Sequence, residues 1–256
     1  MSDELLDLTV VIAHRAGDLL LEYFRAPAQD VESKSTPTDL VSAADKASEA
    51  LILGLIDSKR SGDGVLSEEG GRESSTSGLT WVVDPLDGTI NFLFGSPVWA
   101  VSIAIEDGDG GLVGVIHQPT TGETFSATRG GGAYLDGRPI RVSERADLAS
   151  ALVGTGFAYD ARARAVQAEI AGKVLPKARD IRRAGSAALD LAALSCGRLD
   201  GFYEAPMERW DKAAGVVLIE EAGGVVSELV APFGLSPGVI AANRTLHDQL
   251  RELVLA

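Results

Sequence analysis

The sequence has 256 residues, with 37 Asp or Glu against 23 Lys or Arg, so its formal net charge is −14. A chain this acidic is a poor ligand for nucleic-acid phosphates or anionic membranes, and no apolar run reaches the roughly 18 residues that a membrane-spanning helix needs. The acidic first residues lack the basic start of a signal peptide, and the single cysteine, Cys196, cannot form an internal disulfide. We therefore expect a soluble cytoplasmic protein without a nucleic-acid or membrane partner.

The first half of the chain is predicted to contain two helices and an antiparallel sheet. Apolar residues at spacings of three and four predict a helix over residues 3–24. The polar residues 32–39 predict a loop, and a second helix is expected to begin after Ser42, its N-cap. Asp136 and Gly137 form a two-residue turn signal that predicts a hairpin. The expected strands cover residues 65–69, 79–83, 98–105, 112–118, 124–128, 133–135 and 139–142.

In the second half, strands and helices alternate, which predicts a layered α/β arrangement. The expected helices cover residues 162–175, 186–196, 212–222 and 246–255, and the expected strands cover residues 152–154, 181–183, 199–204, 225–226 and 239–241. The chain length allows one large domain or two fused halves. We predict a boundary at residues 147–150, which divides the chain into an N-terminal α+β half (1–147) and a C-terminal α/β half (148–256).

Residues 81–92 carry the strongest indication of chemistry. A buried-looking strand delivers Asp84 to its carboxyl end, and Asp87 follows three residues later beyond a proline-forced turn. Two such carboxylates are able to hold divalent cations through oxygen. Gly88 and Thr89 then open a short helix whose N–H groups point outward, where an anion can bind. A loop in which an aspartate caps a helix explains Asp84 and Asp87 equally well.

Three more acids lie at the ends of predicted elements. Glu68 ends the strand before Asp84, Asp45 lies in the first turn of the second helix, and Asp211 heads a later helix. Taken singly, an acid at the start of a helix has an ordinary explanation as an N-cap or as a partner of the helix dipole. Like charges at ~4 Å repel strongly at low dielectric, so these acids can lie together only around a cation. If they converge, we predict that they bind metal.

Several segments match one protein family in order and spacing. They are residues 38–41 (Thr-Asp-Leu-Val), 67–69 (Ser-Glu-Glu), 84–92 (Asp-Pro-Leu-Asp-Gly-Thr-Ile-Asn-Phe), 210–215 (Trp-Asp-Lys-Ala-Ala-Gly) and 221–224 (Glu-Ala-Gly-Gly). The sequence resembles the inositol monophosphatase family of Mg²⁺-dependent, lithium-sensitive phosphatases, and the resemblance covers nearly the whole chain. It implies the fold of the sugar-phosphatase superfamily, a sandwich of α, β, α, β and α layers, and assembly as a homodimer.

The resemblance implies a role for each acid. Glu68, Asp84 and the main-chain carbonyl of Leu86 would hold a first Mg²⁺, and Asp84, Asp87 and Asp211 would hold a second. A third, looser ion would lie beside Glu68, which places this residue among the catalytic ones. A phosphate monoester is extremely slow to hydrolyse unaided, and two or three cations per subunit would neutralise its oxygens and activate water.

The resemblance also assigns the groups around the phosphate. Thr89 and Asp45 would position and deprotonate the attacking water. The N–H groups of Gly88 and Thr89 would bind the phosphate, and Lys34 would lie close to it. The phosphate would pass directly to water in an in-line displacement, without a cysteine or histidine nucleophile.

The leaving group is assigned by the same resemblance. Glu204, Ser186 and Ala187 would contact sugar or inositol hydroxyls, and Asp87 would reach a hydroxyl beside the ester. A carboxylate that accepts two vicinal hydroxyls suits a polyol, so inositol 1-phosphate is the expected substrate. Glu204 as a surface acid at a strand end and Ser186 as an ordinary N-cap are the alternative interpretations.

One departure from the family's pattern concerns specificity. Glu208 and Arg209 precede Trp210, where inositol-type members usually have a small or apolar stretch, so Arg209 is a candidate contact for a second anionic group. Histidinol phosphate, fructose 1,6-bisphosphate and nucleotide phosphates therefore stay open as substrates. A non-catalytic regulatory or binding protein on the same fold is an alternative of another class. The complete set of acids in this sequence argues against that alternative.

Overall fold

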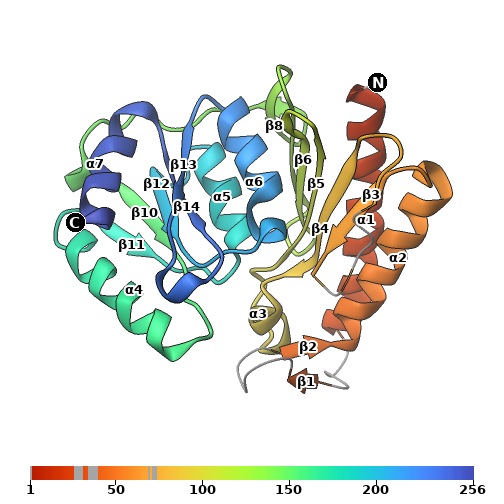
Figure 1. The fold of residues 1–256 in the computed structure, drawn as a ribbon, viewed down its shortest axis with the longest axis horizontal. Helices are drawn as coiled ribbons and strands as arrows, with labels where there is room; N and C mark the ends of the chain where they lie inside the picture. Colours follow the sequence, from red (N-terminus) through yellow and green to blue (C-terminus); the bar gives the residue numbers. More distant parts are fainter. Residues whose placement is uncertain (1, 26–30, 34–39, 69, 71–73) are drawn as a thin grey trace.

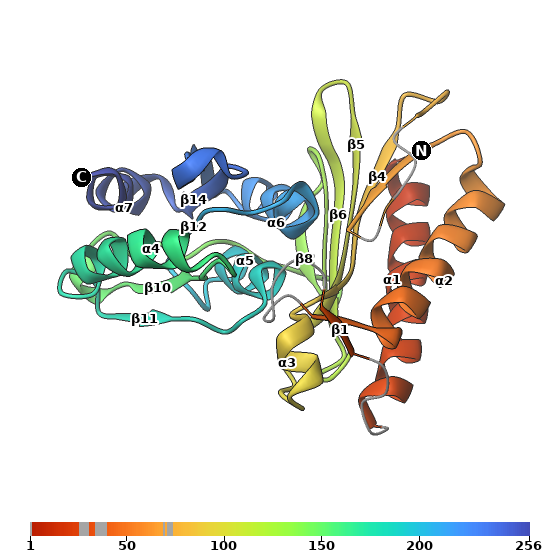
Figure 2. The same ribbon diagram turned by 60° about the horizontal axis from the view of Figure 1, so that its bottom comes forward.

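Five layers stack across the molecule in the order α, β, α, β, α (Figure 1). The computed structural model describes residues 2–25, 31–33, 40–68, 70 and 74–256. Its helices are α1 (Ser2–Arg25), α2 (Ala43–Arg60), α3 (Thr89–Leu93), α4 (Ala161–Val174), α5 (Ala187–Ser195), α6 (Arg209–Glu221) and α7 (Arg244–Leu255). α1 and α2 form one outer layer, α4 and α7 form the other, and α5 and α6 lie between the two sheets (Figure 2). The predicted layered sandwich is therefore confirmed.

The first sheet has seven strands in the spatial order β3-β4-β5-β6-β7-β8-β9. All neighbouring strands are antiparallel except β3 and β4, which are parallel. Its strands are β3 (Gly64–Ser67), β4 (Thr80–Asp87), β5 (Ala100–Asp107), β6 (Gly110–Gln118), β7 (Glu123–Thr128), β8 (Gly132–Leu135) and β9 (Arg138–Pro139). α1 and α2 pack on one face of this sheet, while α6 packs on the other.

The second sheet has five strands in the order β11-β10-β12-β14-β13. β10 is parallel to both of its neighbours, whereas β14 is antiparallel to β12 and β13. Its strands are β10 (Leu152–Thr155), β11 (Asp180–Arg182), β12 (Gly201–Glu204), β13 (Val225–Leu229) and β14 (Gly238–Ala242). The short 3₁₀ helix η1 (Leu148–Ser150) precedes β10, and η2 (Pro232–Gly234) joins β13 to β14.

Apolar side chains fill the spaces between the layers. Leu20 and Ile103 are fully buried between the outer helices and the first sheet, and Leu250 and Ile240 between the second sheet and the opposite outer layer. Each such side chain contributes about 1.5–3 kcal/mol when it leaves water. The middle helix α5 is apolar nearly all round because it contacts both sheets, which fixes the position of its N-terminus. Among the described residues, we find no helix with the length and apolarity needed to span a membrane.

The structure differs from the sequence expectations at a few element ends. Glu32 and Ser33, expected in a loop, form strand β1 (Val31–Ser33), which pairs antiparallel with β2 (Leu40–Ser42). The loop prediction is wrong there because a three-residue strand is too short to show alternation. Helix α6 begins at Arg209 rather than at residue 212. The predicted hairpin turn is confirmed, since the two residues at 136 and 137 have φ values of 50° and 73°.

Candidate active site

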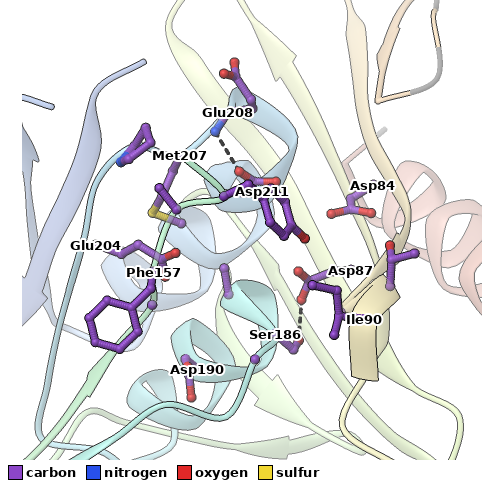
Figure 3. A pocket seen from close by; sticks show the side chains of 18 of the residues that line it. Asp84, Asp87, Ile90, Phe157, Ser186, Asp190, Glu204, Met207, Glu208 and Asp211 are labelled. Carbon is purple, nitrogen blue, oxygen red and sulfur yellow. Dashed lines mark hydrogen bonds between the residues drawn. The ribbon is translucent and has the colours of Figure 1, made fainter. Parts of the chain in front are cut away.

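One cavity of about 500 Å³ brings together most of the residues that the sequence singled out. It lies where the seven-stranded sheet meets the N-termini of α5 and α6 and the carboxyl ends of β10 and β12. Figure 3 shows Asp84 and Asp87 on one side of the cavity and Glu204, Phe157 and Met207 on the opposite side. The predicted residues that line it are Glu68, Asp84, Leu86, Asp87, Gly88, Thr89, Ser186, Ala187, Glu204 and Asp211.

A β-bulge at the end of β4 aims Asp84 and Asp87 into the same cavity. Asp84 pairs with Ser102 of β5 and Asp87 pairs with Ala100, so three steps along β4 span two steps along its neighbour. In a regular strand, residues three apart face opposite sides, and the extra residue of a bulge reverses that alternation. Both aspartates are at least nine-tenths buried and line the cavity. The turn is held from α2, where the buried Ser48 hydroxyl donates to the Pro85 carbonyl at 2.9 Å.

Asp87 connects the two halves of the chain. Its Oδ2 atom accepts a hydrogen bond from the Ser186 hydroxyl and another from the Ala188 N–H at 3.0 Å. Ser186 is also the N-cap of α5, where its Oγ accepts from the Leu189 N–H at 3.2 Å. The N-cap interpretation of Ser186 and its place in the cavity are therefore both correct, and the start of α5 is fixed relative to β4.

The acids of the cavity repel one another. Burial, followed by the charges of Glu68, Asp87, Asp211 and Asp45, raises the pKa of Asp84 well above its ordinary value. Burial is also the main reason that the pKa of Asp211 rises to about 8 and the pKa of Asp87 to about 6. Charges held this close in a protein interior call for a compensating cation.

The donor chemistry of this cluster fits Mg²⁺. Carboxylates and a main-chain carbonyl are the hard oxygen ligands that Mg²⁺ prefers, and the cavity offers them on β4, on the β4–α3 turn and on α6. Among the described residues, no three Asp, Glu, His or Cys side chains already stand where they could coordinate one ion.

Helix α3 begins on the floor of the cavity. Gly88 precedes it with φ of 89°, and a Cβ atom there would lie 2.9 Å from the Val98 carbonyl, so this turn requires glycine. The first N–H groups of a helix have no partner within it, and Gly88 and Thr89 both line the cavity. The Thr89 hydroxyl donates to the Leu86 carbonyl at 3.0 Å. Asp45 is buried in the first turn of α2, and its charge adds to the raised pKa of Asp84.

The opposite wall carries the predicted leaving-group contacts. Glu204 ends β12, and burial, followed by the charges of Asp211, Asp190 and Asp87, raises its pKa well above the ordinary value. Asp190 in α5 is also buried, and burial followed by the charge of Asp87 raises its pKa to about 7. Arg183 is the cation that lines this part of the cavity and opposes both shifts.

The predicted contact Arg209 stands apart from the cluster. The Arg209 guanidinium pairs with Glu106 of β5, and Arg209 is absent from the cavity lining within the described part of the chain. Its neighbour Glu208 does line the cavity and accepts a hydrogen bond from the Ser236 hydroxyl at 2.6 Å. Lys34 lies outside the described residues.

Comparison with known proteins identifies the family. Residues 1–256 match the family described as the inositol monophosphatase family. The chain belongs to the inositol monophosphatase family. Membership of this family is consistent with phosphatase activity, and it agrees with the acids and the α3 N-terminus that share the cavity.

The relatives of this inositol monophosphatase family member carry two kinds of name. "Nus factor SuhB" of Escherichia coli (strain K12) is 39% identical over 243 residues, covering 93% of this chain and 91% of that protein. "Inositol-1-monophosphatase" of Mesorhizobium japonicum is 39% identical over 262 residues, covering 98% of this chain and 96% of that protein. The crystal structure of extragenic suppressor protein suhB from Bartonella henselae has a TM-score of 0.90 and 35% identity, and 98% of each chain is covered.

Sequence reasoning missed three residues around the cavity of this family member. Ser48 carried a usable signal, because it is a hydroxyl on the apolar face of α2. Asp190 carried a similar signal as an acid within the apolar helix α5. Phe157, which lines the cavity beside Glu204, follows β10 in an irregular segment whose sequence gives no indication of where it folds.

Proposed function

We propose that this protein is a Mg²⁺-dependent phosphomonoesterase that hydrolyses a small polyol phosphate, with inositol 1-phosphate as the first candidate. The observation that carries the proposal is the convergence of Glu68, Asp84, Asp87 and Asp211 on one cavity whose opposite wall holds Glu204. The first group of acids could bind the cations that hold the phosphate, and the opposite acid could accept hydrogen bonds from hydroxyl groups. Hydrolysis of a polyol phosphate requires both functions.

The proposed cation ligands come from β4, from α6 and from the residue that follows β3. Glu68, Asp84 and the carbonyl of Leu86 would hold one Mg²⁺, and Asp84, Asp87 and Asp211 another, with a third beside Glu68. Bound Mg²⁺ would lower the pKa of water and neutralise the phosphoryl oxygens. Bound Mg²⁺ would also offset the repulsion between an anionic ester and a protein whose formal net charge is −14.

The chain's own groups would then orient the reactants. The N–H groups of Gly88 and Thr89 would hold the phosphate at the start of α3. The Thr89 hydroxyl would orient the attacking water, and Asp45, which is buried in the first turn of α2, would receive the proton. Lys34 is proposed to lie near the phosphate.

Recognition of the leaving group is assigned to the opposite wall. Glu204 would accept vicinal hydroxyls, and Ser186 with Ala187 would line their path, while Asp87 would reach the hydroxyl beside the ester. The apolar side chains of Phe157 and Met207 face the same space. Histidinol phosphate, fructose 1,6-bisphosphate and nucleotide phosphates are the alternative substrates. The pairing of Arg209 with Glu106 gives no support to an anion contact by Arg209.

The resemblance to the family supports three further parts of the proposal. They are assembly as a homodimer, a cytoplasmic location and inhibition by lithium at the second cation position. The relatives named Nus factor SuhB favour a second candidate function, a regulatory binding role on the same fold. The two functions differ in whether any ester is hydrolysed.

The test is phosphate release from a panel of esters with Mg²⁺ and with chelator. The panel holds inositol 1-phosphate, histidinol phosphate, fructose 1,6-bisphosphate, adenosine 3′,5′-bisphosphate and NADP. We expect Mg²⁺-dependent release, fastest from inositol 1-phosphate. Fastest release from another ester would make that ester the preferred substrate in place of inositol 1-phosphate. Turnover that survives chelator would contradict the Mg²⁺-dependent mechanism. No release from any ester would favour the regulatory role.

A further inference from the structure

A single buried amide lies behind the leaving-group wall of the cavity. Gln167 is in the second turn of α4, and only 6% of its surface is exposed. A helical side chain leans toward the N-terminus of its helix, and here that direction leads to the carboxyl ends of β10 and β12. Gln167 does not line the catalytic cavity itself.

The amide of Gln167 links the segments that follow two neighbouring parallel strands. Its Nε2 atom donates to the Ala205 carbonyl at 2.8 Å, just after β12, and to the Gly156 carbonyl at 3.4 Å, just after β10. Its Oε1 atom accepts from the Ala158 N–H at 2.9 Å. All three partners are main-chain groups beyond the last ladder pair of β10 and β12, so the sheet itself does not hold them.

Glu204 is the last residue of one of these two strands, β12. The Thr155 hydroxyl donates to the Tyr203 carbonyl at 2.8 Å, which ties β10 to β12 immediately before Glu204, and Gln167 ties them immediately after it. The Glu204 carboxylate packs directly on Gly156, where a Cβ atom would lie 2.1 Å from each of its oxygens. Within the described residues, no protein group donates a hydrogen bond to that carboxylate, and Gly156 is the backbone against which it packs.

We infer that Gln167 is a positioning residue for substrate recognition, which holds the ends of β10 and β12 together and thereby aims Glu204 and Phe157 into the cavity. The inference rests on the proposed function and extends it. The proposed cation ligands Glu68, Asp84, Asp87 and Asp211 are not among the hydrogen-bond partners of Gln167 in the described part of the chain. Loss of the amide should therefore weaken recognition of the leaving group and leave hydrolysis itself intact.

Two variants test this inference, one at the amide of Gln167 and one at the backbone on which the Glu204 carboxylate packs. Gln167→Met keeps the length of the side chain and removes all three hydrogen bonds. Gly156→Ala keeps the amide and places a methyl group where the Glu204 carboxylate lies. The matched control is Gln249→Met, because Gln249 is also a helical glutamine that donates to a main-chain carbonyl, that of Ala146 at 2.9 Å, although it is half-buried rather than buried.

The variants are compared on two substrates with Mg²⁺ present. One is the best hydroxyl-bearing ester of the panel, and the other is 4-nitrophenyl phosphate, whose leaving group has no hydroxyl for Glu204. Because a displacement of about 1 Å in a bound group can cost up to about 100-fold, we expect KM for the hydroxyl-bearing ester to rise at least about tenfold in both variants. The aryl phosphate should keep its kcat/KM within about twofold, and Gln249→Met should match the wild type.

Equal loss on both substrates, or an unchanged KM, would overturn the inference. Hydrogen exchange provides a readout that does not depend on activity. In Gln167→Met the amides of residues 156–159 should exchange at least about tenfold faster, because that segment loses its anchor. If the wild type hydrolyses no ester, the proposed function fails, and the exchange result still decides whether Gln167 holds the two strand ends. Unchanged exchange at those residues would refute the positioning role.

Discussion

The two walls of the cavity are built in different ways. On one side of the cavity, which we call the phosphate wall, residues 84–89 form one continuous segment, in which a bulge in β4 presents Asp84 and Asp87 and the next residues begin α3. Glu68 and Asp211 join this wall from other elements. The leaving-group wall is assembled from the ends of separate elements, and we infer that the position of Glu204 depends on Gln167 and Gly156. Under the proposed function, the chemistry would rely mainly on a local motif, whereas the specificity would rely on contacts between residues distant in the chain.

Replacement of Asp84 by Asn is expected to have the largest effect. Loss of a carboxylate shared by two cations removes several kcal/mol of charge stabilisation, which is roughly a 10³-fold or greater loss in kcat on every ester. Because Asp84 is buried among like charges that raise its pKa, the melting temperature without Mg²⁺ should be unchanged or higher. The control is Asp107→Asn on β5, a surface aspartate paired with Arg129 at 3.0 Å. Near-normal kcat in Asp84→Asn would contradict the assignment of the phosphate wall.

Replacement of Glu204 by Ala tests the other wall. A hydrogen bond to a charged group is worth about 1.5–3 kcal/mol, so KM for the polyol phosphate should rise about 10- to 100-fold. The aryl phosphate should be spared. Glu228→Ala, an exposed acid on β13, serves as the control. A similar rise in KM for both esters would mean that Glu204 does not act specifically in recognition of the leaving group.

A smaller and non-selective effect is expected from Ser48→Ala. The Ser48 hydroxyl supports the Pro85 carbonyl between the two aspartates, and its loss should lower kcat about tenfold for both substrates and cost about 1 kcal/mol of stability. Ser58→Ala on the same helix removes an exposed hydroxyl bonded to the Leu55 carbonyl and should leave kcat unchanged. A KM effect confined to the polyol ester would place Ser48 with the leaving-group wall instead.

The smallest effect concerns the pH dependence of stability at the far end of β4. Burial alone would raise the pKa of Asp63, but hydrogen bonds from Arg60, Ser77 and Trp81 outweigh it and hold the pKa below the ordinary 3.8. A carboxyl whose pKa is lower in the folded state stabilises the fold above its unfolded pKa, and this stabilisation is lost as pH falls through the folded value.

Asp63→Asn should therefore melt at a lower temperature than the wild type at pH 7, and the difference should shrink below about pH 4. Thermal denaturation at a series of pH values measures this, with the exposed Asp57→Asn as the control. The activity per folded molecule should not change, because Asp63 does not line the cavity. A difference that stays constant down to pH 3 would show that the ionisation of Asp63 is not involved.

The sequence singled out Asp84, Asp87, Gly88 and Thr89 because their signals are local. They lie within six consecutive residues, 84–89, and the turn that joins them needs glycine at position 88. What the sequence did not reveal is the bulge that brings both aspartates to one side, since it depends on pairing with β5.

The leaving-group wall was less predictable for the same physical reason. Glu204 was found by resemblance, but its contact with Gly156 joins residues 48 positions apart in the chain. The pairing of Arg209 with Glu106 spans 103 positions, and nothing near Arg209 in the sequence indicates it. Side chains whose role depends on a distant partner are therefore recognised only when the fold is known.

The central claim is that the clustered carboxylates form a cation site. Calorimetric titration of the metal-free protein with Mg²⁺ tests it most directly, alongside Asp84→Asn with its fold verified by circular dichroism. We expect the wild type to bind Mg²⁺ and Asp84→Asn to lose at least one binding event while it remains folded. Equal binding by both proteins, or no binding by the wild type, would contradict the account.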